Sequence, residues 1–209
     1  LVIPVPQAAA IMLPLLLVMG ATGLQQLWRH CDRALVRLLL AAGLLGTVVG
    51  TLLFGVLSTA TVAAVVGAVT LLFLAQRLLF PPRADHPPPP KPLGFALGIA
   101  AGFTSFVAHA GSPPFNAYVL PLRLDPMRYA ASAAVFFAAV NLSKWLPYAW
   151  LGLIDGRNMA TSALLMPLAP IGVWLGVWAT KRIDPGWFYR LAYAGMALTG
   201  AKLLYDGLR

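Results

Sequence analysis

The chain has 209 residues, of which 60% are apolar and 10% are charged, and its formal net charge at pH 7 is +9. Soluble domains carry about 25% charged residues, so the composition excludes an ordinary soluble domain and indicates a membrane protein. No basic face stands clear of the apolar runs, which excludes a nucleic-acid partner, and we expect the cations to lie beside anionic lipid headgroups. The single cysteine, Cys31, excludes an internal disulfide and a multi-cysteine metal site.

Apolar windows of about 20 residues, the length that crosses a bilayer as a helix, follow one another along the chain. The first twenty residues contain no Lys or Arg, which excludes a signal peptide, and the chain starts inside apolar sequence, as if an earlier segment were missing. The pattern predicts an all-α fold, a polytopic transmembrane helical bundle. Its expected spans are 8–28, 37–56, 60–80, a broken 94–122, 129–151, 161–180 and 187–206.

A proline-rich run from Pro81 to Pro92 reads as an extended polyproline linker and divides the chain into two halves that look alike. Glycines recur in both halves at matching places, and such spacing usually lets helix backbones approach closely. We therefore predict a first transmembrane repeat at 1–80, a linker at 81–93 and a second repeat at 94–209, with the opening segment of the first repeat absent. The matched glycines are Gly46 with Gly172, Gly50 with Gly176, and Gly67 with Gly195.

Lys and Arg gather in four of the connections between spans, and cytoplasmic loops are rich in these residues. All four connections are cytoplasmic only if 94–122 enters and leaves the membrane on the same side, as a re-entrant segment does. The two halves then form an inverted repeat. If 94–108 crosses completely, the repeat is parallel, and this alternative stays open. The basic connections contain Arg29, Arg33, Arg37, Arg77, Arg83, Lys91, Arg123, Arg128, Lys181, Arg182 and Arg190.

The broken segment 94–122 is the strongest pointer to function. Its apolar run is interrupted near the middle by His109 and by the residues GSPP at 111–114. Irregular backbone at membrane depth is tolerated only where it lines a cavity or is packed inside protein. Interrupted spans mark the binding sites of many transporters. The alternative is an ordinary helix followed by a proline-rich surface turn.

The break also offers groups that attract an anion. A short helix that starts after Pro114 would present free N–H groups to the middle of the membrane. Ser112 stands where a helix cap belongs, and Gly111 would let the backbone approach closely. His109 reads as a packed, hydrogen-bonded residue more readily than as a metal ligand. The candidate substrate-binding residues of the break are Thr104, Ser105, His109, Gly111, Ser112, Pro113, Pro114 and Asn116.

A lysine stands inside the span that follows the break. Asn141, Lys144 and Tyr148 share one helix face. A lysine at the centre of a spanning helix costs about 2.5–3.5 kcal/mol, so such a residue is a functional candidate. A lysine that snorkels to the interface is the alternative, and we adopt that interpretation for Lys202. No carboxylate lies inside a span to bind Na⁺ or relay protons, so Asn141 and Lys144 are added as substrate-binding candidates for an anion.

The remaining motifs are structural. No nucleophile elbow, Walker loop, zinc signature or carboxylate pair occurs, so we expect no enzyme, no cofactor and no metal site. Two Asp-Pro pairs, at Asp125 and Asp184, are expected only to cap the helices that follow them.

The run AGFTSFVAHAGSPPFNAYVLPLRLDPMRYAASAAVFFAAVNLSKWLPY at 101–148 resembles the second-half motif of the TauE/SafE family of sulfite and organosulfonate exporters. The features in common are a small-residue-rich opening, a G-x-P-P-like break and a following helix that carries Asn. Gly111, Ser112, Pro113 and Pro114 match the break, and Asn141 matches the helix residue. The resemblance covers essentially the whole chain and implies transport of a small sulfur-containing anion by two related halves. The Gly-rich motif of the first half is missing here, so part of what should line the site is absent.

The expected protein is therefore a multi-pass inner-membrane transporter that moves a small anion, namely sulfite, a sulfonate or a related sulfur compound. Its expected partners are this anion and the lipid bilayer, and a homo-oligomer is left open. The alternative from another class is a non-transporting membrane scaffold or assembly subunit. Polar residues that converge on a cavity would favour transport, whereas a solid apolar interior would favour the scaffold.

Overall fold

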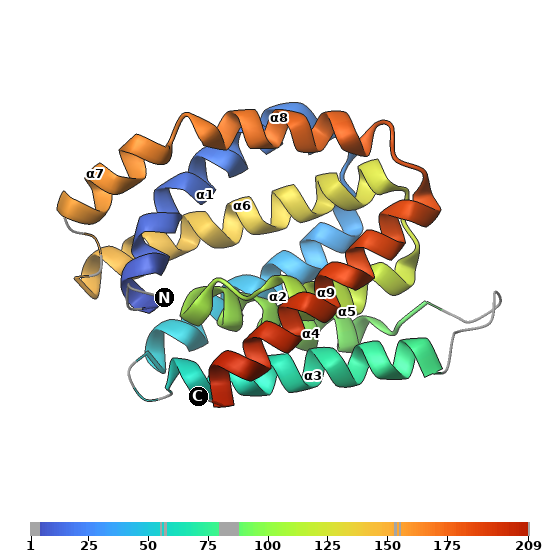
Figure 1. Cartoon of the computed structure of the whole chain (residues 1–209), viewed down its shortest axis with the longest axis horizontal. Coiled ribbons are helices and arrows are strands. Elements are labelled where there is room, and N and C mark those ends of the chain that lie inside the picture. Colours follow the sequence, from blue (N-terminus) through green and yellow to red (C-terminus); the bar gives the residue numbers. More distant parts are fainter. Residues whose placement is uncertain are drawn as a thin grey trace. The chain divides into compact units, whose positions relative to one another are not determined.

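The fold is all helical over the part of the chain that the computed structural model describes, residues 5–54, 56, 58–79, 88–152, 154 and 156–208 (Figure 1). No strand interrupts the helices within these residues, as the apolar pattern predicts. The helices are α1 (Val5–Leu27), α2 (Arg33–Leu52), α3 (Thr59–Leu79), α4 (Lys91–Ala108), α5 (Ser112–Val119), α6 (Pro126–Trp150), α7 (Gly156–Leu165), α8 (Leu168–Thr180) and α9 (Pro185–Leu208). The 3-10 turns η1 (Trp28–His30) and η2 (Leu120–Leu122) follow α1 and α5.

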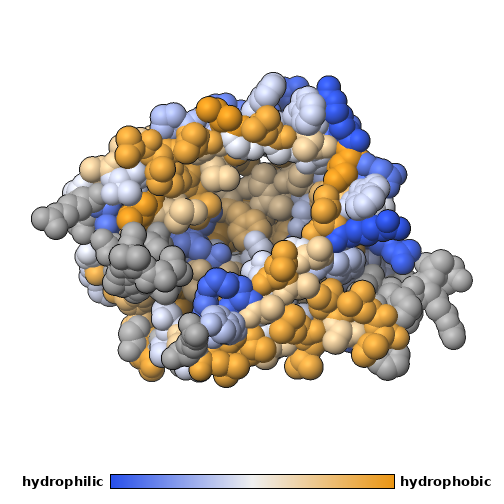
Figure 2. Space-filling view, viewed as in Figure 1, coloured by the Kyte–Doolittle hydropathy of each residue, from blue (hydrophilic) through white to orange (hydrophobic). Residues whose placement is uncertain are grey.

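Four of the described helices are long and apolar enough to cross a bilayer: α1 with η1, α2, α3 and α4. The pair α7 and α8 gives a fifth if it is counted as one span. Helices α6 and α9 have 25 and 24 residues, enough to cross a bilayer, but they are less apolar than the other four. Apolar residues also cover much of the face seen in Figure 2. The chain is therefore a multi-pass membrane protein.

The span expected at 161–180 is not one unbroken helix. Helices α7 and α8 are separated by Met166 and Pro167 and are bent by 45°. A proline has no N–H, and its ring clashes with the carbonyl four residues earlier, so it kinks or breaks a helix. The prediction of a continuous span was wrong here, although Pro167 was visible in the sequence.

The proline-rich linker ends earlier than predicted. Residues 80–87 lie outside the described residues. Residues 88–90 form no regular structure, and Pro90 has polyproline angles, φ −65° and ψ 145°. Lys91 and Pro92 already belong to the first turn of α4. A helix tolerates proline there because the missing N–H would have had no partner within the helix.

Contacts group the chain into two compact units, which we describe separately. Unit 1 contains Leu1–Leu40 and Asp125–Ile183, and unit 2 contains Ala41–Leu124 and Asp184–Arg209. Each unit takes helices from both predicted halves. The division into 1–80, 81–93 and 94–209, and any symmetry between the halves, therefore stay predictions.

In unit 1, α1 runs along α6 and also packs against α7 and α8. Small residues on both helices form the contact of α1 with α6. A Cβ atom added to Gly20 would come to 3.0 Å from Ala138 Cβ, and one added to Gly23 would come to 3.5 Å from Ala134 Cβ. Small residues of this kind let spanning helices approach closely, which strengthens their packing in lipid.

In unit 2, α3 and α9 pack with their backbones in contact. A Cβ atom added to Gly67 would overlap the backbone of α9 at Leu204, and one added to Gly207 would overlap the backbone of α3 at Ala64. Lipid tails are as apolar as leucine, so no hydrophobic effect drives these helices together, and close packing holds them instead.

The matched glycines of the two halves do not have matching surroundings. Gly46 and Gly50 lie against α4, whereas no described atom of a neighbouring element lies within 4 Å of a Cβ built on Gly172, Gly176 or Gly195. The expectation of close helix packing was therefore wrong for these three glycines within the described chain. The spacing of glycines shows which face of a helix lacks side chains. It does not show whether another helix packs against that face.

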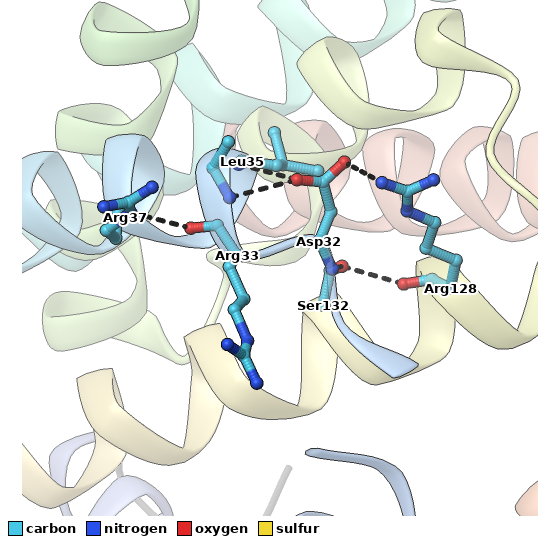
Figure 3. Close-up of polar contacts among 7 residues, drawn as sticks. Asp32, Arg33, Leu35, Arg37, Arg128 and Ser132 are labelled. Atoms are coloured by element: carbon cyan, nitrogen blue, oxygen red, sulfur yellow. Dashed lines mark hydrogen bonds and ion pairs between the residues drawn. The ribbon is translucent and has the colours of Figure 1, made fainter. Parts of the chain in front are cut away.

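Aspartates cap the starts of three helices. As predicted, Asp125 Oδ1 accepts hydrogen bonds from two amides in the first turn of α6, at 2.9 and 3.3 Å. Asp184 Oδ1 does the same for α9, at 2.8 and 3.3 Å. Asp32, which the sequence analysis left without a role, caps α2 and also accepts a bond from Arg128 Nη2 at 2.9 Å (Figure 3). Because Asp32 N donates to Ser132 Oγ, this network ties the α1–α2 turn to α6 within unit 1.

We predict that Gly67→Ala lowers the midpoint of thermal unfolding of the purified protein in detergent. The added methyl group would overlap the α9 backbone, and overpacking of this kind costs about 1–3 kcal/mol. Gly195→Ala is the matched control, since it makes the same change on α9 in open space. Alanine is favoured over glycine in a helix by about 1 kcal/mol, so the control should not lose stability. Equal losses in the two variants would contradict the contact of α3 with α9.

Candidate functional site

The predicted break in 94–122 is present, between α4 and α5. Helix α4 ends with His109 in the left-handed conformation, φ 50° and ψ 24°. The amides of His109 and Ala110 donate to Ser105 O and Thr104 O, each at 3.1 Å. Many helices end in this way, usually with glycine at the left-handed position. A residue with a side chain is strained there by about 1–2 kcal/mol.

The residues after His109 differ in part from the prediction. Gly111 has φ −75° and ψ −19°, a right-handed conformation that any residue adopts, and it is buried. The backbone angle at Gly111 therefore does not require glycine. Ser112 is exposed, and α5 begins without a side-chain cap. The prediction that Ser112 caps the helix was wrong, because the chain is already helical at Gly111.

The free amide groups of the break lie before the proline pair and not after it. Pro113 and Pro114 have no N–H, and Phe115 N donates to Gly111 O at 3.2 Å. In the described part of the break, the amides of Gly111 and Ser112 are the ones left without an acceptor. The positive end of the α5 dipole still favours an anion at this place.

Thr104 ties the end of α4 to the backbone of the break. Its hydroxyl oxygen lies 2.8 Å from Ala100 O in the same helix and 2.9 Å from Ala110 O in the break. A hydroxyl has a single proton, which these two carbonyls share. Thr104 is buried, so its hydroxyl holds the backbone of the turn. Contact of Thr104 with a substrate stays a prediction.

Helix α5 turns back along α4 and does not continue it. A Cβ atom added to Gly94, near the start of α4, would overlap the ring of Tyr118, near the end of α5. With 8 residues, α5 is about 12 Å long and is too short to cross a hydrocarbon core of about 30 Å. The broken segment therefore folds back on itself, as expected of a re-entrant segment.

Glycines of α2 hold α4 in place just before the break. A Cβ atom added to Gly46 would overlap Ile99 O, and one added to Gly102 of α4 would overlap Gly43 O. The two helices touch backbone to backbone, so a side chain at either position would push α4 away. The sequence analysis missed this contact. The signal was available, because 94, 98 and 102 are all glycine and repeat the four-residue spacing seen on α2.

A pocket of about 320 Å³ lies beside the break in unit 2, between α3, α4 and α5. Pro113 and Pro114 line it, together with valine, leucine, alanine and phenylalanine side chains and three threonines. The threonine hydroxyls are used within the protein: Thr70 Oγ1 donates to a backbone carbonyl at 2.6 Å, Thr61 bonds to Ser58, and Thr104 holds the break. The pocket therefore suits an apolar occupant better than an anion.

Lys144 lies on α6 in unit 1 with 0% of its surface exposed. Its Nζ donates to Asn141 Oδ1 at 2.9 Å, one turn earlier on the helix. Tyr148, one turn later, is also buried. The three residues share a buried face, as their spacing predicts. A snorkelling lysine would expose its ammonium, so that alternative does not hold for Lys144. Lys202 differs, because its side chain is 60% exposed and pairs with Asp206; that it snorkels to the interface stays a prediction.

The candidate residues fall into two sets, one in each unit. Asn141 and Lys144 belong to unit 1, and the residues of the break belong to unit 2. Their contact with a substrate stays a prediction for both sets. In the break, the buried residues are Thr104, Ser105, Gly111 and Pro113, the half-buried ones are His109, Pro114 and Asn116, and Ser112 is exposed.

A multi-pass helical protein with a broken segment that folds back on itself and a buried lysine–asparagine pair is consistent with a membrane transporter. Residues 1–203 match the family described as sulfite exporter TauE/SafE. The chain therefore belongs to this family of membrane transporters, as the resemblance of residues 101–148 predicts. No curated protein and no solved structure matches the chain.

We predict that Thr104→Val lowers the midpoint of thermal unfolding, because it leaves the buried Ala110 carbonyl without a donor. An unsatisfied buried polar group costs about 1–3 kcal/mol. Thr70→Val is the matched control on the wall of the same pocket, since its hydroxyl only donates to Val66 O within α3. The control should change the midpoint much less. A Thr104 variant as stable as the Thr70 variant would show that the hydroxyl does not hold the break.

Proposed function

We propose that this chain exports a small sulfur-containing anion, sulfite or a sulfonate, across the inner membrane. Membership of the sulfite exporter family supports this class of substrate. The observation that carries the proposal is the burial of Lys144 and its bond to Asn141. No carboxylate stands in the interior of a span of this chain, which contains no Glu at all.

In the proposed mechanism the ammonium of Lys144 attracts the anion and offsets part of the cost of removing it from water. Asn141 holds the ammonium through its side-chain oxygen and so fixes the position of the charge. A buried charge is strongly unfavourable unless it is compensated. No acidic side chain lies inside a span, so an incoming anion would bring the opposite charge close to the Lys144 ammonium.

The break supplies a second group that attracts anions. The amides of Gly111 and Ser112 point from the start of α5, where the helix dipole is positive. We propose that the missing side chain at Gly111 lets the backbone come close to a ligand. The strained His109 and the bond from Thr104 to Ala110 keep this turn in one shape. We propose that Ser105 and Asn116, which flank the turn, complete its polar surface.

We predict that Lys144→Met strongly weakens the affinity for sulfite while the protein still folds and inserts. Lys144→Arg should keep transport and alter its selectivity, because a planar guanidinium binds anions differently from a point charge. Asn141→Ala should weaken affinity as well, since it releases the ammonium. Lys202→Met is the control, because it removes an exposed lysine from α9, and it should transport like the parent protein.

These variants are compared by flux into proteoliposomes of radioactive sulfite and of a sulfonate, with sulfate and chloride as further anions, over a range of concentrations. Saturable sulfite or sulfonate flux that is lost in Lys144→Met, weakened in Asn141→Ala and retained in Lys202→Met would support the proposal. Flux that is identical in all four variants would contradict the role of Lys144. The absence of flux for every anion would favour a membrane scaffold.

We propose in addition that 94–122 is re-entrant and that the two halves form an inverted repeat. The return of α5 along α4 supports this proposal, although α4 alone is long enough to cross the bilayer. We predict that single cysteines placed at His86 and Asp184, in a variant without Cys31, react with an impermeant thiol reagent from the same side of the membrane, the cytoplasmic one. This prediction rests on the enrichment of Lys and Arg in the connections, because cytoplasmic loops are rich in these residues. Labelling of the two positions from opposite sides would instead support a parallel repeat.

A further inference from the structure

One end of unit 1 carries two pairs of tryptophan and arginine. The ends of α1 and α8 meet there, because Leu27 and Val177 belong to one buried cluster with Ala131 of α6. The next residues along the two helices, Trp28 and Trp178, are 48% and 47% exposed. This end therefore presents two large aromatic side chains outward.

An arginine lies over each of these rings. The guanidinium carbon of Arg29 is 5.5 Å from the ring centroid of Trp28, and that of Arg182 is 4.3 Å from the ring centroid of Trp178. Lys181 adds a third exposed cation beside Arg182. In Figure 2, hydrophilic residues gather near the C-terminal end of α8.

The acidic residues at this end are already used by the protein. Asp32 accepts two amide bonds at the start of α2 and pairs with Arg128. Asp125 accepts two amide bonds at the start of α6. In Figure 3 the side chain of Arg33 points away from Asp32. Within the described residues, neither Asp32 nor Asp125 forms an ion pair with Arg29, Lys181 or Arg182.

We propose that Arg29, Lys181 and Arg182, flanked by Trp28 and Trp178, bind the headgroup of an anionic phospholipid. Tryptophan side chains gather at the headgroup level of a membrane, and basic residues gather on its cytoplasmic side. Guanidinium groups match the geometry of phosphate oxygens. At this depth the anion that meets the cations is a lipid phosphate, and the rings hold the arginines in position to meet it.

The test measures lipid binding by the full chain in detergent, using native mass spectrometry with phosphatidylglycerol and phosphatidylcholine of equal chain length. The parent protein should retain phosphatidylglycerol in preference to phosphatidylcholine. Each basic side chain near an anionic surface contributes about fivefold, so the double variant R29Q/R182Q should bind about 25-fold more weakly. The control R190Q removes an arginine that stacks on Trp187 in unit 2, at 5.4 Å, and should bind like the parent.

A second variant, R29K/R182K, keeps both charges and should retain most of the binding, which separates lost charge from lost folding. Three results would each overturn the proposal. The first is parent-like binding by R29Q/R182Q, and the second is equal binding of both lipids by the parent. The third is displacement of the lipid by millimolar glycerol phosphate, which would make this a site for a soluble anion.

Discussion

The backbone contact of α2 with α4 is the constraint on which the rest of the candidate site depends. A membrane gives no hydrophobic drive to bring helices together, so their association rests on close packing. Gly46 and Gly102 remove the side chains that would keep the two helices apart. This contact fixes α4 directly before the break, and the bond from Thr104 to Ala110 then fixes the turn itself. Gly46, Gly102 and the hydroxyl of Thr104 therefore fix the position of the irregular backbone.

The second constraint is the cost of a charge away from water. Lys144 is fully buried and bonded to Asn141, and the interior of the spans contains no carboxylate. By contrast, the acids of the helix starts, such as Asp32 and Asp125, cap helices at the ends of spans. The capping acids thus lie at helix ends, whereas Lys144 places a basic side chain in the interior. An interior cation of this kind suits a protein whose family carries anions.

The features predicted correctly from the sequence are those that depend on residues close together along the chain. Composition and apolar windows predict the membrane class, and the interruption at 109–114 predicts the broken segment. The predictions that were wrong concern residues whose effect depends on their position in a helix or on the helix packed against them. Pro92 was assigned to the linker but belongs to the first turn of α4, whereas Pro167 breaks a predicted span, because proline acts differently at helix starts and interiors. Glycine spacing did not reveal that Gly46 is covered and Gly172 is open, since only the fold brings a neighbour there.

The central claim of this account is that the buried ammonium of Lys144 meets the transported anion. Selenite, the selenium analogue of sulfite, scatters X-rays anomalously and can be located directly in crystals of the protein. The account predicts an anomalous peak within hydrogen-bond distance of Lys144 Nζ, and its loss in crystals of Lys144→Met. Selenite peaks found only beside exposed arginines, with none at Lys144, would contradict the account.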